Sequence, residues 1–362
     1  MKKAIFFLSV FLVSLSCAFT NGEKEQQTSG DQNTSTGGEK LNVGLCLTQL
    51  GDNSIGDQLY NGVLAAQKKW GFDLDYTECG TSDMAAVMQD YTESKEYDLI
   101  VLLSYHAMDA AIAMHDKYPD QKYLIYDVGV SGKPGIMSES FAKNQLGFVA
   151  GAYAALMDQQ GQITINGQTK KFTPSHNFGE MIGVELTSTV GAMTGFAAGV
   201  HYIDPDAKVQ YVSVGSWTDQ TRAKELALTV YNNGANILFH NAGGAFLGAL
   251  EAAKTVDKFA IGYDANQNAL DATHIIGSSH KQNTDVIVRF FDLFCSGGWK
   301  GGTNIVNGFD NDGAKLTYQE NLEVPEDVRK VINEVIAKIK SGEIVPPNTW
   351  DEEKNFLLTY NN

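Results

Sequence analysis

The sequence predicts an α/β protein with two doubly wound, parallel-sheet lobes around a hinged cleft. From residue 41 onward, apolar strand-like runs alternate with segments of helical periodicity, which predicts parallel strands joined by right-handed crossovers. The alternation falls into two similar sets, and one apolar run in each set ends in an aspartate, Asp127 and Asp264. Carboxylates at the carboxyl ends of parallel strands lie where open α/β sheets bind ligands, so we expect one cleft with an acidic group on each wall.

Strands and helices alternate regularly in the first half of the chain. We expect strands over residues 41–47, 73–76, 98–103 and 123–128, and helices over residues 55–70, 84–94 and 107–117. The first helix is indicated by the near-helical spacing of Ile55, Leu59 and Val63. Pro119 lies just beyond the third helix, where a proline typically follows a helix end.

The second half repeats this scheme. We expect strands over residues 181–184, 209–214, 237–240, 259–263 and 273–278, and helices over residues 190–201, 220–232, 245–255 and from 284 onward. Between the halves, Asn166 and Gly167 predict the type I′ turn of an inserted hairpin. Pro325 opens the last expected helix, in which an apolar stripe (Val328, Ile332, Val335, Ile339) precedes a closing Gly342.

The order of these elements predicts that the chain crosses between the lobes more than once. We assign the N-terminal lobe to residues 41–143 plus about 275–305, and the C-terminal lobe to residues 144–274 plus about 306–355. Crossover strands at the base of a cleft allow the lobes to close on a ligand by hinge motion.

The N-terminal segment predicts export and a lipid anchor. Two lysines precede an apolar run over residues 4–15, and the small residues before Cys17 resemble a bacterial lipoprotein processing site. We therefore expect residues 1–17 to be a lipoprotein signal peptide with Cys17 as the acylation site. An ordinary secretory signal cut near Ser16 or Ala18 is the alternative. The expected location is the bacterial cell membrane, facing the periplasm or the cell exterior.

Residues 18–40 are almost entirely polar and predict a disordered tether, because such a segment buries too little apolar surface to offset its ordering entropy. The net charge of −16 argues against nucleic acid as a partner.

The remaining cysteines predict no disulfide framework, and none of them has the spacing of metal ligands. Cys46 is expected to be buried, and a disulfide between Cys79 and Cys295 stays open.

Motifs of enzymes are missing from the sequence. It contains no Gly-x-Ser-x-Gly elbow, phosphate loop, Gly-x-Gly-x-x-Gly after the first strand, or His-Glu-x-x-His. His106 and His240 stand at expected strand ends, where a structural role is favoured over a ligand contact. Asp52 and Asp57 are too few for the metal site of a nucleoside hydrolase. The sequence therefore predicts a protein that is not an enzyme and has neither cofactor nor metal.

Polar loops at the carboxyl ends of strands are the candidate site. In the first loop, Asp52 and Ser54 can either cap the following helix or point into the cleft. Trp217 can either stack on a planar ring or pack under its loop. Gly243 lets the backbone approach a ligand at a helix N-terminus, and Lys281 lies where the chain returns to the first lobe.

The motifs in these loops, taken in order, resemble those of the basic-membrane-protein (Bmp) family, also called PnrA-like purine nucleoside receptors. The resemblance runs from about residue 41 to about residue 346. The matching motifs are residues 52–57, 126–127, 144–147, 217–219, 242–244, 262–264 and Lys281. Members of this family are lipoproteins with a type I periplasmic-binding-protein fold that deliver substrates to ABC importers. The resemblance implies a monomer that binds a nucleoside and docks to an ABC permease.

The resemblance also implies roles for individual residues. Asp264 and Lys281 would hold the ribose hydroxyls with backbone groups of Gly243, while Asp127 would face the base and Trp217 would stack on it. A carboxylate accepts hydrogen bonds well from vicinal hydroxyls.

The first loop departs from the family pattern, since Ile55 and Gly56 replace the family's Phe and Asn, and Asp57 brings a carboxylate nearby. The leading expected ligand is a purine nucleoside, and a pyrimidine nucleoside or another ribose-bearing molecule is the alternative. A ligand sensor or surface interaction lipoprotein with the same fold is the alternative to transport.

Overall fold

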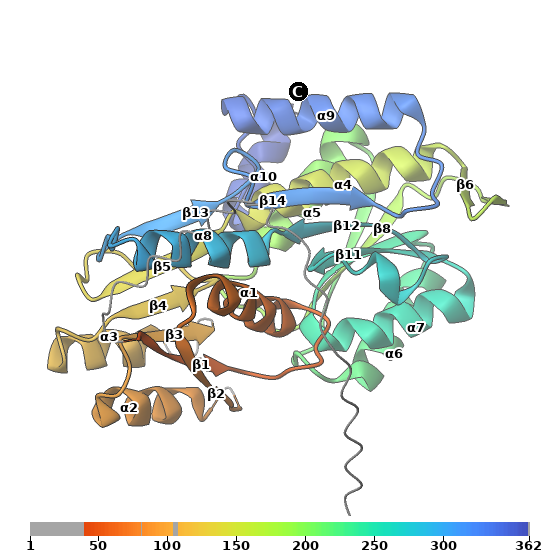
Figure 1. The fold of residues 1–362 in the computed structure, drawn as a ribbon. Helices are drawn as coiled ribbons and strands as arrows, with labels where there is room; N and C mark the ends of the chain where they lie inside the picture. Colours follow the sequence, from red (N-terminus) through yellow and green to blue (C-terminus); the bar gives the residue numbers. More distant parts are fainter. Residues whose placement is uncertain (1–39, 81, 104–107, 361–362) are drawn as a thin grey trace, which may run out of the picture. The chain divides into compact units, whose positions relative to one another are not determined.

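The computed structural model describes residues 40–80, 82–103 and 108–360. Within these ranges the chain forms two six-stranded sheets, a two-stranded hairpin and helices that cover the sheets (Figure 1). Predictions on the signal peptide, Cys17, the tether up to residue 39 and His106 lie outside the described residues. No helix of the described part is long and apolar enough to cross a lipid bilayer.

The first sheet has the strand order β13-β5-β4-β3-β1-β2, and every neighbouring pair in it is parallel. Its strands are β1 (Asn42–Leu47), β2 (Asp73–Glu78), β3 (Leu99–Leu103), β4 (Tyr123–Tyr126), β5 (Ile136–Phe141) and β13 (Asn304–Asn307). Its helices are α1 (Ile55–Trp70), α2 (Met84–Ser94), α3 (Met108–Lys117) and α8 (Asn283–Cys295). These elements form the N-terminal lobe and enclose one apolar core.

The second sheet has the order β14-β12-β11-β10-β8-β9, parallel except for the antiparallel edge strand β14. Its strands are β8 (Asn177–Ile182), β9 (Lys208–Ser213), β10 (Ile237–Asn241), β11 (Phe259–Asp264), β12 (Ile275–Lys281) and β14 (Ala314–Tyr318). The helices of this C-terminal lobe are α4 (Lys143–Gln159), α5 (Gly191–Ile203), α6 (Gln220–Asn232), α7 (Phe246–Val256), α9 (Glu326–Ser341) and α10 (Trp350–Tyr360).

Helices cover both faces of the second sheet, so its central strands read as continuous apolar runs. One core cluster includes Phe239 and Tyr263 with residues of α4, α5 and α9, and another includes Leu238 and Ala260 with residues of α6 and α7. Successive strand residues thus alternate between the two cores. Helices α4 and α5 approach very closely, since a Cβ on Gly151 would lie 2.1 Å from the Phe196 carbonyl oxygen.

Local predictions from turn chemistry and periodicity are confirmed. The hairpin consists of β6 (Gln162–Ile165) and β7 (Gln168–Lys171), with positive φ at both turn residues, Asn166 (52°) and Gly167 (72°). The expected apolar stripe of α9 is its buried face, and Gly342 caps the helix in the left-handed conformation. This helix is not the last one, because α10 follows.

The chain passes between the lobes three times, after β5, after β12 and after β13 (Figure 1). The expected return of residues from about 275 to the N-terminal lobe differs from the structure. Strand β12 pairs with β11 and β14 in the second sheet, so the crossing begins only after Lys281. Strand β5 was not expected, because its sequence Ile-Met-Ser-Glu-Ser-Phe is not a continuous apolar run.

The described cysteines are all free thiols, so Cys79 and Cys295 form no disulfide. Cys46 is buried in the N-terminal core, as expected, and burial raises the pKa of its thiol.

Candidate functional site

The predicted site residues lie at strand ends, in the loops that follow strands or, for Ile55 and Asp57, in the first turn of α1, at the carboxyl edges of the two sheets. Asp52, Ser54, Ile55 and Asp57 follow β1 in the N-terminal lobe, and Asp127 follows β4; Trp217, Gly243, Asp264 and Lys281 follow or end β9, β10, β11 and β12 in the C-terminal lobe. Asp127 and Asp264 both adopt positive φ, 73° and 64°. Aspartate is among the few non-glycine residues that tolerate this conformation.

Lys281 joins the two aspartates. Its Nζ donates a hydrogen bond to Asp127 Oδ1 at 2.8 Å and lies 2.6 Å from Asp264 Oδ1. The second contact is an ion pair whose angle does not make a hydrogen bond. The rings of Phe141 and Tyr263 lie 5.3 and 5.4 Å from the ammonium. Burial works to lower the pKa of Lys281, but the two carboxylates outweigh it and raise the pKa.

A second buried lysine, Lys143, also contacts Asp127. Its Nζ lies 2.8 Å from Asp127 Oδ2 and 3.2 Å from the Asp127 carbonyl oxygen. Burial lowers the pKa of Lys143, the Asp127 carboxylate opposes this shift, and the nearby Lys281 charge adds to it. Burial works to raise the pKa of Asp127, but Lys143 and Lys281 outweigh it and hold the pKa below its usual range. Each oxygen of Asp127 therefore faces one ammonium group.

The first loop contacts the C-terminal lobe at two points. Ser54 Oγ donates to Asp264 Oδ2 at 3.1 Å, and Gln267 Nε2 donates to the Asn53 carbonyl oxygen at 3.1 Å. Ser54, Asp264 and Gln267 are buried. Together with the Lys281–Asp127 and Lys143–Asp127 pairs, these bonds link the two lobes through side chains at the candidate site.

Asp52 and Asp57 organise the first loop. The Asp52 carboxylate accepts from the backbone N–H groups of Ser54, Gly56 and Asp57 at 2.8, 2.9 and 3.2 Å. The Asp57 carboxylate accepts from the backbone N–H groups of Gly51 and Asn53. Burial raises the pKa of Asp52 although these backbone bonds oppose the shift. For Asp52 the contacts are those of the capping alternative. The Ser54 side chain makes no capping bond and reaches Asp264 instead, and Asp57 ties the loop ahead of α1.

Ile55 and Gly56 are explained by packing within the N-terminal lobe. Ile55 is half-buried against the N-terminal core. A Cβ at position 56 would lie 2.4 Å from the Gln49 carbonyl oxygen, so the loop needs glycine there. The departure from the family pattern thus accompanies a tight loop that leaves no room for an amide side chain at position 56.

Trp217 is half-buried and packs on backbone. A Cβ at Gly183 would lie 2.4 Å from Trp217 Cε3, and a Cβ at Gly243 would lie 3.6 Å from the same atom. The Trp217 carbonyl accepts from Ala245 N at 2.8 Å, which ties this loop to the turn that carries Gly243. The benzene part of the Trp217 ring therefore packs under its loop, which is the structural alternative predicted from the sequence.

His240 belongs to the core of the C-terminal lobe. Its ring stacks on Phe246 with centroids 3.7 Å apart, and Nε2 pairs with Gln267 Oε1 at 2.9 Å. Burial lowers the pKa of His240 to about 4, so the ring is neutral at pH 7.

A buried carboxyl group, Glu139, lies where two crossovers meet. Its Oε2 accepts from Asn307 Nδ2 at 2.7 Å, and the Asn307 carbonyl accepts from Ala142 N. Arg289 donates to Asn307 Oδ1 at 3.0 Å. Burial raises the pKa of Glu139 to about 7, although the Asn307 bond and the Arg289 charge oppose the shift.

The sequence interpretation missed Lys143 and Gln267. Lys143 directly precedes residues 144–147, but the strand before it, β5, is not a continuous apolar run, so the sequence did not place Lys143 after a strand end. Gln267 follows Asp264 closely in the chain, and only its folded position shows that it reaches the other lobe.

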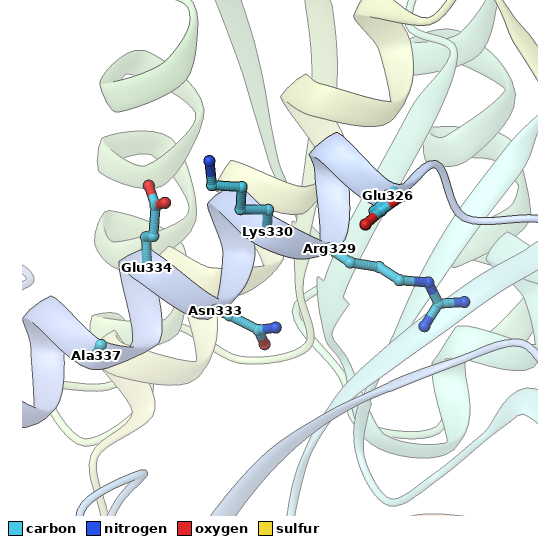
Figure 2. A pocket seen from close by; sticks show the side chains of 6 residues that line it. All are labelled: Glu326, Arg329, Lys330, Asn333, Glu334 and Ala337. Carbon is cyan, nitrogen blue, oxygen red and sulfur yellow. The ribbon is translucent and has the colours of Figure 1, made fainter.

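A separate surface hollow of about 450 Å³ lies along the exposed face of α9, lined by Glu326, Arg329, Lys330, Asn333, Glu334 and Ala337 (Figure 2). None of these residues belongs to the candidate site. In the described part of the chain, no group of three or more His, Cys, Asp or Glu side chains is placed to hold a metal ion.

The two lobes, their crossovers and the polar strand ends define a class of fold, the type I periplasmic-binding-protein fold. A solute-binding protein of an ABC transporter system from Aeropyrum pernix superposes with a TM-score of 0.76 at 22% identity, covering 89% of this chain and 98% of that one. A solute-binding protein from Actinobacillus succinogenes with bound D-allose has a TM-score of 0.61 at 13% identity, covering 78% and 99%. These likenesses confirm the predicted fold.

Residues 43–349 match the Bmp family, described as ABC transporter substrate-binding protein PnrA-like, and the chain belongs to this family. It is 26% identical to an uncharacterised lipoprotein of Pyrococcus horikoshii, over 85% of this chain and 84% of that protein. It is 25% identical to basic membrane protein A2 of Borrelia garinii subsp. bavariensis, over 84% and 88%. The predicted family is confirmed, and it is a family of substrate-binding proteins rather than a class of enzymes.

Proposed function

We propose that this protein binds a nucleoside, with a purine nucleoside as the leading ligand, between its two lobes and delivers it to an ABC importer. The observation that carries the proposal is the buried cluster of Asp264, Lys281, Asp127 and Ser54, which joins both lobes at the carboxyl edges of their sheets. Ligands of open α/β sheets bind at this edge.

The polar groups suit a ribose-bearing molecule. The Asp264 Oδ1 atom is buried and accepts no hydrogen bond from the described residues, so it is available to a hydroxyl donor. Lys281 supplies donors beside it, and Gly243, with φ of 54°, leaves backbone groups open to close approach. In this proposal Asp264 and Lys281 hold the ribose hydroxyls, Asp127 lies toward the base, and Trp217 flanks the base.

Calorimetric titration of the purified protein with a panel of nucleosides, free bases, sugars and peptides tests the ligand class. We expect binding of at least one nucleoside and no binding of the matched free sugar. Binding of sugars or peptides without any nucleoside would overturn the proposal. Native mass spectrometry of the protein as purified adds an independent test, since a co-purified ligand identifies its own class.

We further propose that Cys17 is acylated and that a polar segment tethers the folded part to the outer face of a bacterial membrane as a monomer. The support is the sequence around Cys17 and the naming of relatives as lipoproteins and membrane proteins. Loss of nucleoside uptake on gene deletion, restored by the intact chain, would support transport. Normal uptake combined with an altered nucleoside response would instead favour the sensor alternative.

A further inference from the structure

Lys143 occupies a position that helix stability alone disfavours. It is the first residue of α4, and a cation in the first turn of a helix opposes the helix dipole. Its side chain is also only 7% exposed, so its charge is largely removed from water. Both effects cost stability, and buried charges of this kind concentrate at functional sites.

The contacts of Lys143 go to one site residue, Asp127. Two of its three ammonium hydrogens serve Asp127, at the Oδ2 atom and at the carbonyl oxygen. The other carboxylate oxygen of Asp127 accepts from Lys281. Asp127 belongs to the N-terminal lobe and both lysines to the C-terminal lobe, so the group forms where the lobes meet.

This arrangement offers a ligand a hydrogen-bond donor at Asp127, where the sequence predicted an acceptor. A lone carboxylate attracts N–H donors, such as the amino group of a base. Each Asp127 oxygen already faces an ammonium, and Lys281 also pairs with Asp264, so the charges of the two lysines and the two aspartates balance. One hydrogen of the Lys143 ammonium is left over after its two contacts with Asp127. A hydrogen-bond acceptor on the ligand can therefore take the remaining Lys143 hydrogen, whereas an amino group meets Asp127 oxygens that are already occupied by lysine donors.

We propose that Lys143 is a specificity-determining residue that selects nucleosides with a carbonyl oxygen, rather than an amino group, at the base edge facing Asp127. The inference rests on the proposed function, because it concerns the base end of the same site. It assigns the ligand to the oxo-nucleosides, of which inosine and uridine are members.

Two matched ligand pairs test this selection, inosine against adenosine and uridine against cytidine. In each pair a carbonyl replaces the exocyclic amino group, and the neighbouring ring nitrogen carries a hydrogen in the carbonyl member. In whichever pair binds to the wild-type protein, we expect the carbonyl member to bind at least about tenfold more tightly than the amino member. A charge-assisted hydrogen bond contributes enough free energy for this difference. Lys143→Met should reduce this ratio to below about threefold, and Lys143→Arg should retain a preference. Lys171→Met, at an exposed lysine of β7, is the matched control and should leave the ratio unchanged.

The outcomes separate this inference from the proposed function. Equal affinities within each pair, or a preference for the amino members, overturn the inference while nucleoside binding stands. An unchanged ratio in Lys143→Met also overturns it. Failure of every nucleoside to bind wild-type protein overturns the proposed function and this inference with it. Should Lys143→Met fail to fold, the wild-type ratio and Lys143→Arg decide the question.

Discussion

Replacing Asp264 by asparagine tests whether this carboxylate receives the ligand. Asparagine keeps the shape and tolerates the left-handed backbone at φ 64°, whereas alanine would add backbone strain of about 1 kcal/mol. At 2.6 Å from Lys281 the pair attraction is about 6 kcal/mol for an effective dielectric constant of about 20. Relief of the buried carboxylate's desolvation offsets most of this, and Lys281 keeps Asp127. We expect the free energy of unfolding to fall by about 1–3 kcal/mol with the fold retained.

The same substitution should weaken nucleoside binding about 10- to 100-fold, because hydrogen bonds to a charged acceptor contribute about 1.5–3 kcal/mol. Titration calorimetry and urea unfolding measure the two effects separately. Asp312→Asn is the matched control, since Asp312 also has positive φ (58°) but is exposed and lies outside the candidate site. Wild-type affinity in Asp264→Asn, with stability lowered as expected, would show that the carboxylate is structural and refute the reasoning.

Three further predictions concern other residues. The fluorescence of Trp217, obtained as the difference between the wild-type protein and Trp217→Phe, should change on nucleoside addition. A constant difference spectrum with bound ligand would show that the ring only packs within the protein. Cys17→Ser should move the protein from the membrane to the soluble fraction; continued membrane association would exclude the cysteine as the anchor. Burial raises the pKa of Glu139 to about 7, so the folded state binds a proton that the unfolded state releases at lower pH. Stability should therefore fall by about 3 kcal/mol between pH 4.5 and 7, and Glu139→Gln should lessen this loss in urea unfolding across pH.

The sequence predicted the features that depend on local pattern. Runs of apolar residues and helical spacing indicated most strands and helices, and the Asn166–Gly167 pair indicated the hairpin turn. The two aspartates were recognised because each ends an apolar run, and the structure brings both to Lys281. Side-chain periodicity and turn conformation arise from a few neighbouring residues, so one sequence suffices to show them.

Contacts between distant residues were decided only by the tertiary structure. The polar strand β5 gains its place from pairing with β4 and β13, and with it Lys143 reaches Asp127. Asp52 and Asp57 were candidates for ligand contact until the folded loop showed their oxygens on backbone N–H groups.

The sequence by itself determined the α/β class, the family and the residues that line the carboxyl edges of the strands. The tertiary structure decided the sheet to which β12 belongs, the second lysine on Asp127 and the bonds that link the lobes through Ser54 and Gln267. The physical reason is the sequence separation over which each kind of interaction acts. Periodicity acts within one element, whereas ion pairing at the site depends on strand order and crossovers, which set the distance between residues far apart in the chain.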